Sequence, residues 1–271
     1  PMTAEPTQTV QIQQSPLQHE ICEQPDFVSL VLVGGRNAGK SVAASMRILT
    51  LAGRHPSFSV ICIRHDWEDL AKLKRIFDDY APLYFPNAEI RGQIKAPGMY
   101  LQIGEHIRID FRAWRDASDE HRIRGASYNC VLLDDAGVFS TPQPLIDARS
   151  ALRGNAGIPS TWIITANPGD EAAWLRDDYF WSEHGKPAAE PGTNMPFVRY
   201  TMTAADNPFI DVDEFLANMS IGMKTDPVRT MGFITGKDPG ISQQFFFAAC
   251  FDPARSRVPV WEDLPPYGWR Y

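Results

Sequence analysis

Apolar and polar positions along the chain alternate in a way that predicts strands and helices following one another. Short β-branched runs that end at glycine or polar residues are typical of buried strands, and apolar residues three or four apart are typical of helices. The runs expected to be strands span 27–34, 58–63, 129–134 and 161–165. The helical patterns span 40–51, 67–80 and 145–152. This alternation favours an α/β fold with a mainly parallel β-sheet flanked by helices and wound by right-handed crossovers.

Other segments give weaker signals. Residues 99–103 and 107–111 are apolar runs separated by Gly104 and Glu105, so they predict a small hairpin. Beyond residue 170, patterns are helical at 172–181 and 212–223 and extended at 197–202. Glycine and proline are frequent around these later segments, which predicts a looser arrangement there than in the first part of the chain.

The same pattern divides the chain into three parts. Residues 1–20 are rich in Gln, Pro and Thr without hydrophobic periodicity, so we expect a flexible N-terminal arm. Residues 21–252 are expected to form the folded domain, with a C-terminal lid or linker subdomain from about residue 170. Residues 253–271 contain several prolines and are predicted to be a linker leaving the domain.

Composition places the chain among ordinary globular proteins. It has 271 residues, of which 44% are hydrophobic and 22% are charged, so collagen-like, coiled-coil and wholly disordered classes are excluded. With 26 basic and 33 acidic residues the net charge is -7, the wrong sign for a domain that coats nucleic acid over its whole surface. Any contact with nucleic acid is therefore expected to be local.

Membrane and redox signals are weak. No apolar run approaches the roughly 18 residues of a membrane span, and no Lys or Arg precedes Arg36, so neither a membrane segment nor a secretory leader is predicted. The four cysteines are scattered without a CxxC pair, which favours reduced, buried thiols over a disulfide framework or a zinc site. We therefore expect a cytoplasmic protein.

The most specific motif is GGRNAGKS, which satisfies the pattern GxxxxGK[ST] between a predicted strand and a predicted helix. Glycines let consecutive N–H groups surround a phosphate, and the helix N-terminus adds positive potential. The lysine is expected to reach the β- and γ-phosphates and the serine to hold Mg²⁺. The predicted nucleotide-binding residues are Gly34, Gly35, Arg36, Asn37, Ala38, Gly39, Lys40 and Ser41. A glycine turn capped by Ser41 is the structural alternative.

A second loop supplies acidic groups at the end of a buried strand. In VLLDD, Asp134 is predicted to hold Mg²⁺ together with Ser41, and Asp135 to orient or deprotonate the attacking water. Paired aspartates at a strand end can instead cap the following turn. The Asp135 side chain is one methylene shorter than the glutamate common in ATP hydrolases, so its carboxylate reaches the water at a different angle.

A third loop and several arginines complete the candidate site. Thr165 and Asn167 in TANP follow another buried strand, where a polar side chain can sense the γ-phosphate, although an Asn-Pro turn is the structural alternative. Arg36 in the phosphate loop, and Arg122 and Arg124 ahead of the acidic strand, are candidates to neutralise charge on the transferred phosphoryl group. For the last two, an exposed surface position is an equal alternative.

Together these loops resemble the ATPase domain of the large terminase subunit of tailed double-stranded DNA bacteriophages, a P-loop NTPase of the RecA/ASCE-like class. The resemblance covers residues from about 25 to 250. Its motifs are Arg36 in the phosphate loop, Arg124-Gly125 before the acidic strand, TANP at 165–168, Asp206-Asn207-Pro208, and RTMGFITG at 229–236. Two departures stand out: the family has a glutamate where Asp135 stands, and the nuclease domain that normally follows in the family is expected to lie outside this chain.

The resemblance implies ATP hydrolysis that powers translocation of double-stranded DNA into a preformed capsid, with ATP and Mg²⁺ as cofactors. It implies catalytic roles for Asp135, Arg36 and Arg124, coupling by Thr165 and Asn167, and an arginine, Arg124 or Arg122, acting on a neighbouring subunit. The implied partners are double-stranded DNA, the portal protein, the small terminase subunit and further copies in a ring on the procapsid, with a monomer in isolation. The implied location is the host cytoplasm during virion assembly, without a membrane.

Two other function classes remain open from the sequence. One is another P-loop enzyme, a helicase motor or a nucleotide kinase, although the residues after Asn167 lack the strand-helix alternation of a second motor lobe. The other is a nucleotide-gated module without catalysis, in which Asp135 is too short to act.

Overall fold

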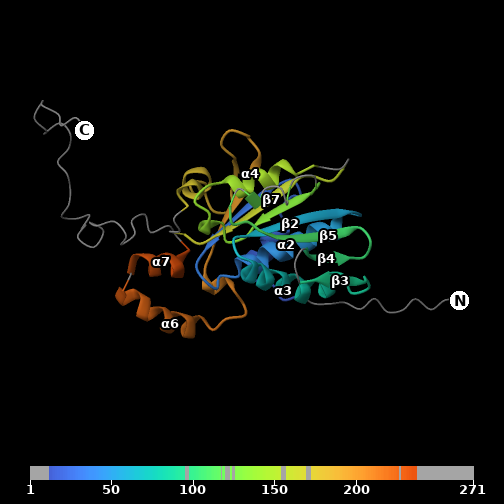
Figure 1. Cartoon of the computed structure of the whole chain (residues 1–271). Helices are drawn as coiled ribbons and strands as arrows, with labels where there is room; N and C mark the ends of the chain where they lie inside the picture. Colours follow the sequence, from blue (N-terminus) through green and yellow to red (C-terminus); the bar gives the residue numbers. More distant parts are fainter. Residues whose placement is uncertain are drawn as a thin grey trace, which may run out of the picture.

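The computed structural model describes residues 12–94, 98–116, 118–119, 123, 126–153, 157–168, 172–225 and 227–236 (Figure 1). The predicted site residues Arg122 and Arg124 lie outside the described residues, as do Gly125 and the predicted linker at 253–271. All other predicted site residues are described.

The helices are α1 (Pro16–Cys22), α2 (Lys40–Arg54), α3 (Trp67–Tyr84), α4 (Gln143–Ser150), α5 (Ala173–Leu175), α6 (Val212–Thr225) and α7 (Pro227–Thr235). The strands are β1 (Ser29–Gly34), β2 (Phe58–Arg64), β3 (Ile90–Gln93), β4 (Met99–Ile103), β5 (Ile107–Ala113), β6 (Cys130–Leu133), β7 (Thr161–Ala166), β8 (Pro187–Ala189) and β9 (Pro196–Met202). Short helical turns are η2 (Ala136–Val138), η3 (Arg176–Phe180, π-helical) and η4 (Ala204–Asp206).

The strands of the described part of the chain form one nine-stranded sheet in the order β3-β4-β5-β2-β6-β7-β1-β9-β8. From β5 to β9 every neighbouring pair is parallel, whereas β3 and β4 at one edge and β8 at the other are antiparallel. Strand β7 lies between β1 and β6, so the two strands that lead to the glycine loop and the acidic loop are not direct neighbours. The predicted mainly parallel α/β sheet is confirmed.

Helices cover both faces of the parallel strands, and alternate residues of each strand point to opposite faces. In β1, Leu30 and Leu32 pack in the cluster that α2 and α3 share, whereas Val31 and Val33 pack with residues of α4 and α5. Figure 1 shows α2 and α3 below the sheet and α4 above it. Because both faces are buried, these strands are apolar throughout, which explains the continuous runs in the sequence.

The structure differs from the predicted N-terminal arm at its last residues, because Pro16–Cys22 form helix α1. Ser15 and Gln18 make a capping box, in which the Ser15 hydroxyl accepts from the Gln18 N–H and the Gln18 side chain accepts from the Ser15 N–H. Ile21 and Cys22 are buried against the core. A seven-residue helix is too short for its periodicity to stand out in a Gln-rich sequence.

Beyond β7, the chain adds β8 and β9 to the sheet and then the helices α6 and α7, which pack against each other at one side of the molecule (Figure 1). The pattern at 172–181 becomes α5 followed by the π-helical turn η3.

Cys22, Cys62 and Cys130 are buried and unbridged. Of the helices in the described segments, none is both long enough and apolar enough to cross a bilayer.

Candidate functional site

The carboxyl ends of β1, β6 and β7 meet at one edge of the sheet. Val33 of β1 is in register with Ala166 of β7, and Leu133 of β6 is in register with Ile164 of β7. The loops that follow these strands therefore begin within one or two residues of the same level. Ligands of parallel α/β sheets bind at this edge, and the three loops singled out in the sequence come together there.

The glycine loop joins β1 to the N-terminus of α2. Lys40 folds back over it, and its ammonium donates to the carbonyl oxygens of Gly34 (2.9 Å) and Gly35 (2.8 Å) and to Asn167 Oδ1 (2.9 Å). Gly39 is the N-cap of α2 at φ 81°, a left-handed conformation that favours glycine. A Cβ at Gly34 would lie 2.3 Å from the Met202 carbonyl oxygen, so only glycine fits there.

Asp134, directly after β6, is fully buried and holds the loops together. Its Oδ1 accepts from the Ser41 hydroxyl at 2.8 Å and from the Thr165 hydroxyl at 2.6 Å. Thr165 also accepts from the Asp135 N–H at 2.9 Å. One carboxylate oxygen thus joins the start of α2 to the end of β7, which brings together the serine, acidic and threonine positions that the sequence predicts.

Arg64 is a functional candidate that the sequence analysis missed. It is the last residue of β2, next to β6 in the sheet, and its Nε lies 2.6 Å from Asp134 Oδ2 in an ion pair. The N–H is not aligned with that oxygen, so the contact is chiefly electrostatic. Its Nη1 donates to the Asp69 carbonyl (3.0 Å), which holds the side chain in place. A charged residue ending a buried strand at this edge was the available signal.

Asp135 occupies a left-handed backbone conformation, at φ 58° and ψ 48°. Its Oδ1 accepts from Asn167 Nδ2 at 3.3 Å, and Asn167 also accepts from Lys40. Burial raises the pKa of Asp135; Arg64 and Lys40 oppose that rise, whereas Asp134 adds to it. Asp135 therefore combines a raised pKa with a position beside the glycine loop and a hydrogen bond from Asn167.

The residues present fit a hard divalent cation held jointly with a nucleotide. Ser41 Oγ and Asp134 Oδ1 are oxygen donors 2.8 Å apart, of the type that Mg²⁺ prefers. Within the segments described, no group of three or more His, Cys, Asp or Glu side chains could hold a metal ion. The protein therefore offers a partial ligand set, which suits an ion that keeps waters and binds phosphate oxygens.

Arg36 is exposed at the outer side of the glycine loop and faces α6 across a cavity of about 600 Å³. The cavity is lined by Arg36, Asn37, Phe209, Ile210, Asp211, Glu214, Phe215, Asn218 and Met219. Arg36 thus lies on the loop, as predicted, and lines the cavity that faces α6. The predicted roles of Arg122 and Arg124 fall outside the described residues.

Gln18 of α1 is a second residue that the sequence analysis missed, because it lies in the segment read as an arm. Its side chain is fully buried, and within the described chain its amide nitrogen has no hydrogen-bond partner. That nitrogen is 3.1 Å from where a Cβ of Gly39 would stand. A buried, unpaired amide donor therefore lies against the start of α2, beside the phosphate loop.

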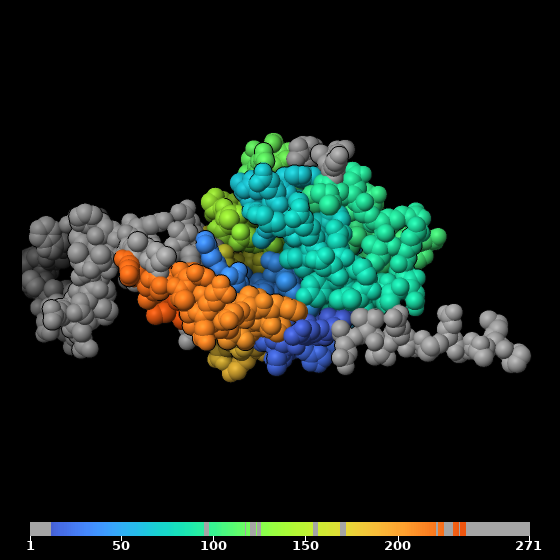
Figure 2. All heavy atoms as spheres, turned by 90° about the horizontal axis from the view of Figure 1, so that it is seen from below, coloured from blue at the N-terminus to red at the C-terminus, as the bar shows by residue number. Residues whose placement is uncertain are grey.

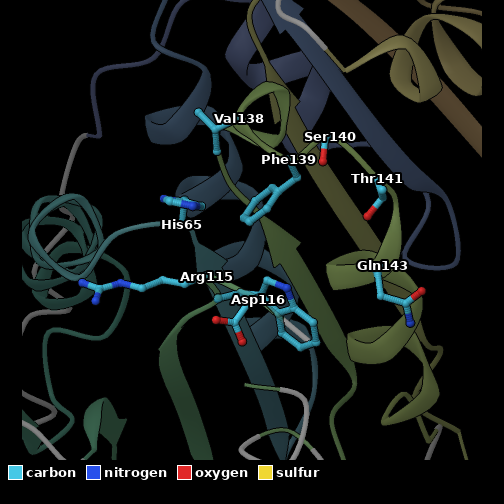
Figure 3. A pocket seen from close by; sticks show the side chains of 9 residues that line it. His65, Arg115, Asp116, Val138, Phe139, Ser140, Thr141 and Gln143 are labelled. Atoms are coloured by element: carbon cyan, nitrogen blue, oxygen red, sulfur yellow. The ribbon is translucent and has the colours of Figure 1, made fainter. Parts of the chain in front are cut away.

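A separate cavity of about 430 Å³ opens beyond the acidic loop (Figure 3). His65 and Arg115 lie on one side of it and Ser140, Thr141 and Gln143 on the other, with Phe139 between them. Arg115 and Asp116 give its lining one charge of each sign, and no glycine is among the described residues that line it. The geometry therefore favours the glycine loop over this cavity as the triphosphate site.

Comparisons with known proteins support the fold. No protein-family model matches the sequence, and no curated protein is similar to it in sequence. Among solved structures, a large terminase ATPase domain of Thermus phage P74-26 superposes with a TM-score of 0.60 at 14% identity, covering 83% of this chain and 94% of that one. The large terminase of bacteriophage HK97 gives 0.56 at 14% identity, covering 83% of this chain and 50% of that one.

A further similar structure is the large terminase of a thermophilic bacteriophage in complex with ADP, with a TM-score of 0.56 at 15% identity, covering 76% of this chain and 50% of that one. The chain thus spans about half the length of the complete large terminases that it matches. At these identities the likeness establishes the fold. The predicted P-loop NTPase fold is confirmed, and this chain has the fold of large terminase ATPase domains.

Proposed function

We propose that this chain hydrolyses ATP to power the translocation of double-stranded DNA into a preformed capsid, as a large terminase motor. The observation that carries the proposal is the joined site at the carboxyl edge of the sheet, where Lys40, Ser41 and Asp134 meet. The terminase ATPase fold supports the packaging role, and the ADP complex of a similar terminase supports nucleotide binding.

In this proposal the glycine loop binds the triphosphate through main-chain N–H groups and Lys40. The Lys40 ammonium, which contacts two loop carbonyls and Asn167, transfers to the β- and γ-phosphate oxygens. Ser41 and Asp134 would hold Mg²⁺ together with the nucleotide, and the ion would neutralise phosphate charge. Arg64 pairs with Asp134 Oδ2, which leaves Oδ1 of the same carboxylate directed toward Ser41 and the loop.

Asp135 acts as general base in the hydrolysis step. It accepts a proton from the attacking water, whose oxygen forms a bond to the γ-phosphorus while the bond from that phosphorus to the β,γ-bridging oxygen breaks. The burial that raises its pKa makes it a better proton acceptor at neutral pH than an exposed aspartate. Arg36 and, from a neighbouring copy, Arg124 or Arg122 neutralise the charge that develops on the phosphoryl group.

Thr165 and Asn167 couple hydrolysis to movement. Asn167 contacts both Lys40 and Asp135, so loss of the γ-phosphate changes both of its partners at once. Thr165 contacts Asp134 and the main chain of Asp135. The segment that follows them leads to the later strands and to α6 and α7, which form the lid.

The working assembly proposed is a ring of copies on the procapsid in the host cytoplasm, with the portal protein, the small terminase subunit and double-stranded DNA as partners, and no membrane. An isolated copy is proposed to be monomeric and nearly idle, because a neighbour completes the site.

A nucleotide-gated module without catalysis is the second candidate, and the position of Asp135 favours it. Its short side chain is held by Asn167 at a left-handed turn, which limits its reach. Asp135→Glu discriminates between the two candidates, because a longer carboxylate gains turnover only if the site is built for hydrolysis.

The test measures ATP turnover by the full chain with and without double-stranded DNA, and separately ATP binding, for the wild type and Lys40→Ala. We expect Lys40→Ala to weaken ATP binding at least about 100-fold, because the β- and γ-phosphates lose their cation. Lys72→Ala, an exposed lysine of α3, is the matched control and is expected to change nothing. Equal binding by wild type and Lys40→Ala would contradict the site. Transfer to small phosphate acceptors, with no effect of DNA, would indicate a kinase.

A further inference from the structure

Two sequence motifs play no part in the chemistry described so far: the turn at Asp206-Asn207-Pro208 and the glycine-rich segment that ends at Gly236. Both lie against the outer side of the phosphate loop. Asn207 contacts Asn37 in the loop, and Gly236 packs on Gly34 at its beginning. The segment that carries α6 and α7 therefore contacts the outer side of the phosphate loop at two points, Asn37 and Gly34.

Asn207 makes the most direct contact. Its Nδ2 donates to the Asn37 carbonyl oxygen at 2.7 Å, while its Oδ1 accepts from the Phe209 N–H at 3.1 Å. Its side-chain carbons lie within 3.7 Å of where a Cβ of Gly39 would stand. One side chain thus hydrogen-bonds the loop at Asn37, lies beside the N-cap of α2, and accepts from the main chain of the turn that leads to α6.

The peptide geometry gives this contact a consequence inside the loop. The C=O and the N–H of one trans peptide point in opposite directions. Because Asn207 holds the Asn37 carbonyl outward, the N–H of Ala38 in the same peptide is directed to the inner side of the loop. The peptide between Gly34 and Gly35 shows the same opposition in the reverse sense: its carbonyl accepts from Lys40, and its N–H donates outward to the Met202 carbonyl at 3.1 Å.

Gly236, directly after α7, makes the second contact with the start of the loop. It adopts φ 68°, and a Cβ there would lie 2.6 Å from the Met202 carbonyl oxygen and 3.1 Å from Gly34 Cα. The α7 terminus therefore packs directly on the start of the loop, at a distance that only glycine allows. Both ends of the helical pair α6–α7 are thus attached to the phosphate loop, one through Asn207 and the other through Gly236.

Between the contacts at Asn207 and Gly236, a cavity separates α6 from the loop. The cavity of about 600 Å³ separates Arg36 and Asn37 from the side chains of α6. Figure 2 shows the orange atoms of α6 beside the blue atoms of the amino-terminal part of the chain. Among the described contacts, the Asn207 turn therefore joins Asn37 to the segment that leads into α6.

We propose that Asn207 is a positioning residue for triphosphate binding: by holding the Asn37 carbonyl it aims the Ala38 N–H at the phosphate, and it ties occupancy of the loop to the position of α6. This inference rests on the proposed nucleotide site. If Asn207 only stabilised its own turn, its loss would lower thermal stability and leave nucleotide affinity unchanged.

The matched control comes from the same turn. Thr203 and Asp206 form a capping box, in which the Thr203 N–H and hydroxyl both donate to Asp206 Oδ2 at 2.7 and 2.9 Å. Thr203→Val removes the hydroxyl contact and weakens the turn without touching Asn37. Asn207→Ala removes both the turn contact and the loop contact.

The experiment measures the Kd of ATP-γ-S by calorimetry, and KM and kcat for ATP, on the full chain. Asn207→Ala is expected to raise Kd and KM about tenfold, equivalent to about 1.4 kcal/mol, with kcat at saturation within about twofold. Asn207→Gln, which keeps the amide donor, is expected to recover most of the affinity. Thr203→Val is expected to keep Kd within about twofold even though it lowers the melting temperature.

Two further variants keep the outcome decisive. Asn207→Ser retains an acceptor for the Phe209 N–H but cannot reach Asn37, so it replaces Asn207→Ala if that variant does not fold. Lys40→Ala runs in parallel: if it too leaves ATP-γ-S binding unchanged, the nucleotide site itself is wrong. Tight binding by Asn207→Ser or Asn207→Ala, or equal weakening by Thr203→Val, while Lys40→Ala has lost binding, would overturn the role of Asn207.

Discussion

Two buried carboxylates, Asp134 and Glu190, have similar partners but lie at opposite ends of the parallel strands, Asp134 at the carboxyl ends and Glu190 at the amino ends. Asp134 follows β6 at the carboxyl edge and contacts Ser41, Thr165 and Arg64. Glu190 lies between β8 and β9 near the amino edge, and it accepts from Arg149 at 2.5 and 2.8 Å, from the Tyr179 hydroxyl at 2.6 Å and from the Thr193 hydroxyl. Each has an arginine and two hydroxyl donors.

The difference lies in what each carboxylate holds together. The arginine of Glu190 also lies over the Trp162 ring, 5.4 Å from its centroid, and Tyr179 packs on the same ring, so this cluster is part of the core. Asp134 instead joins the start of α2 to the ends of β2 and β7, beside a glycine loop. An arginine and two hydroxyl donors around a buried carboxylate therefore do not by themselves indicate a functional site. The position of Asp134 at the carboxyl ends of the parallel strands, next to the glycine loop, is what makes it a candidate.

The largest expected effect is on turnover, in Asp134→Asn. An amide keeps the hydrogen bonds from Ser41 and Thr165 at Oδ1 but removes the negative charge that Mg²⁺ needs. We expect kcat for ATP to fall at least about 1,000-fold, with ATP affinity within a few-fold of the wild type. Steady-state hydrolysis and calorimetry measure the two quantities. Wild-type turnover in Asp134→Asn would contradict the functional role that separates Asp134 from Glu190.

Glu190→Gln is the counterpart and acts on stability. Its loss of charge leaves the half-buried Arg149 guanidinium without its ion partner, so we expect the free energy of unfolding to fall by about 3 kcal/mol. Turnover per folded molecule is expected to stay unchanged. Denaturant unfolding measures the first quantity and the hydrolysis assay the second. A loss of kcat with intact stability would place Glu190 in the site instead.

The smallest effect concerns pH, and it has opposite signs at the two edges. Burial raises the pKa of Asp135, so its ionisation costs stability as pH rises through the window between the unfolded and the folded values. Asp135→Asn, which also tolerates the left-handed backbone, is therefore expected to stabilise the protein by up to about 1 kcal/mol at pH 7 and by less in acid.

For Glu190, burial raises the pKa, but the hydrogen bonds from Arg149, Thr193 and Tyr179 outweigh it and the pKa is lowered. The stability that this carboxylate contributes is present above its unfolded value and is lost as pH falls through the folded one. Unfolding curves of wild type, Asp135→Asn and Glu190→Gln against pH test both signs. The same direction of shift in both variants would contradict the assignment.

The sequence predicts the three loops well because each depends on local chemistry. Gly39 and Lys40 belong to the GxxxxGK[ST] motif, whose local conformation is characteristic. Asp134 and Thr165 lie at the carboxyl ends of strands whose buried apolar runs are visible in the sequence. Their meeting follows from the common edge of parallel strands. The sequence therefore supplied the fold class and the residues at the centre of the site.

Residues that act through contacts distant in sequence could not be predicted in the same way. Arg64 meets Asp134 only because β2 and β6 are neighbours in the sheet, an order that hydrophobic runs do not reveal. Gln18 reaches the loop from a helix of one or two turns, and Asn207 reaches Asn37 across 170 residues. The strand order and the folding of later segments over the loop are tertiary properties that no local pattern contains.

The most direct test of the account is a crystal structure of the chain soaked with a non-hydrolysable ATP analogue and Mg²⁺. We expect the phosphates inside the loop of residues 34–41, with Lys40 moved from the Gly34 and Gly35 carbonyls onto phosphate oxygens and with Ser41 and Asp134 facing the metal. A nucleotide in the cavity lined by His65 and Phe139, or Asp134 directed away from the phosphates, would contradict it.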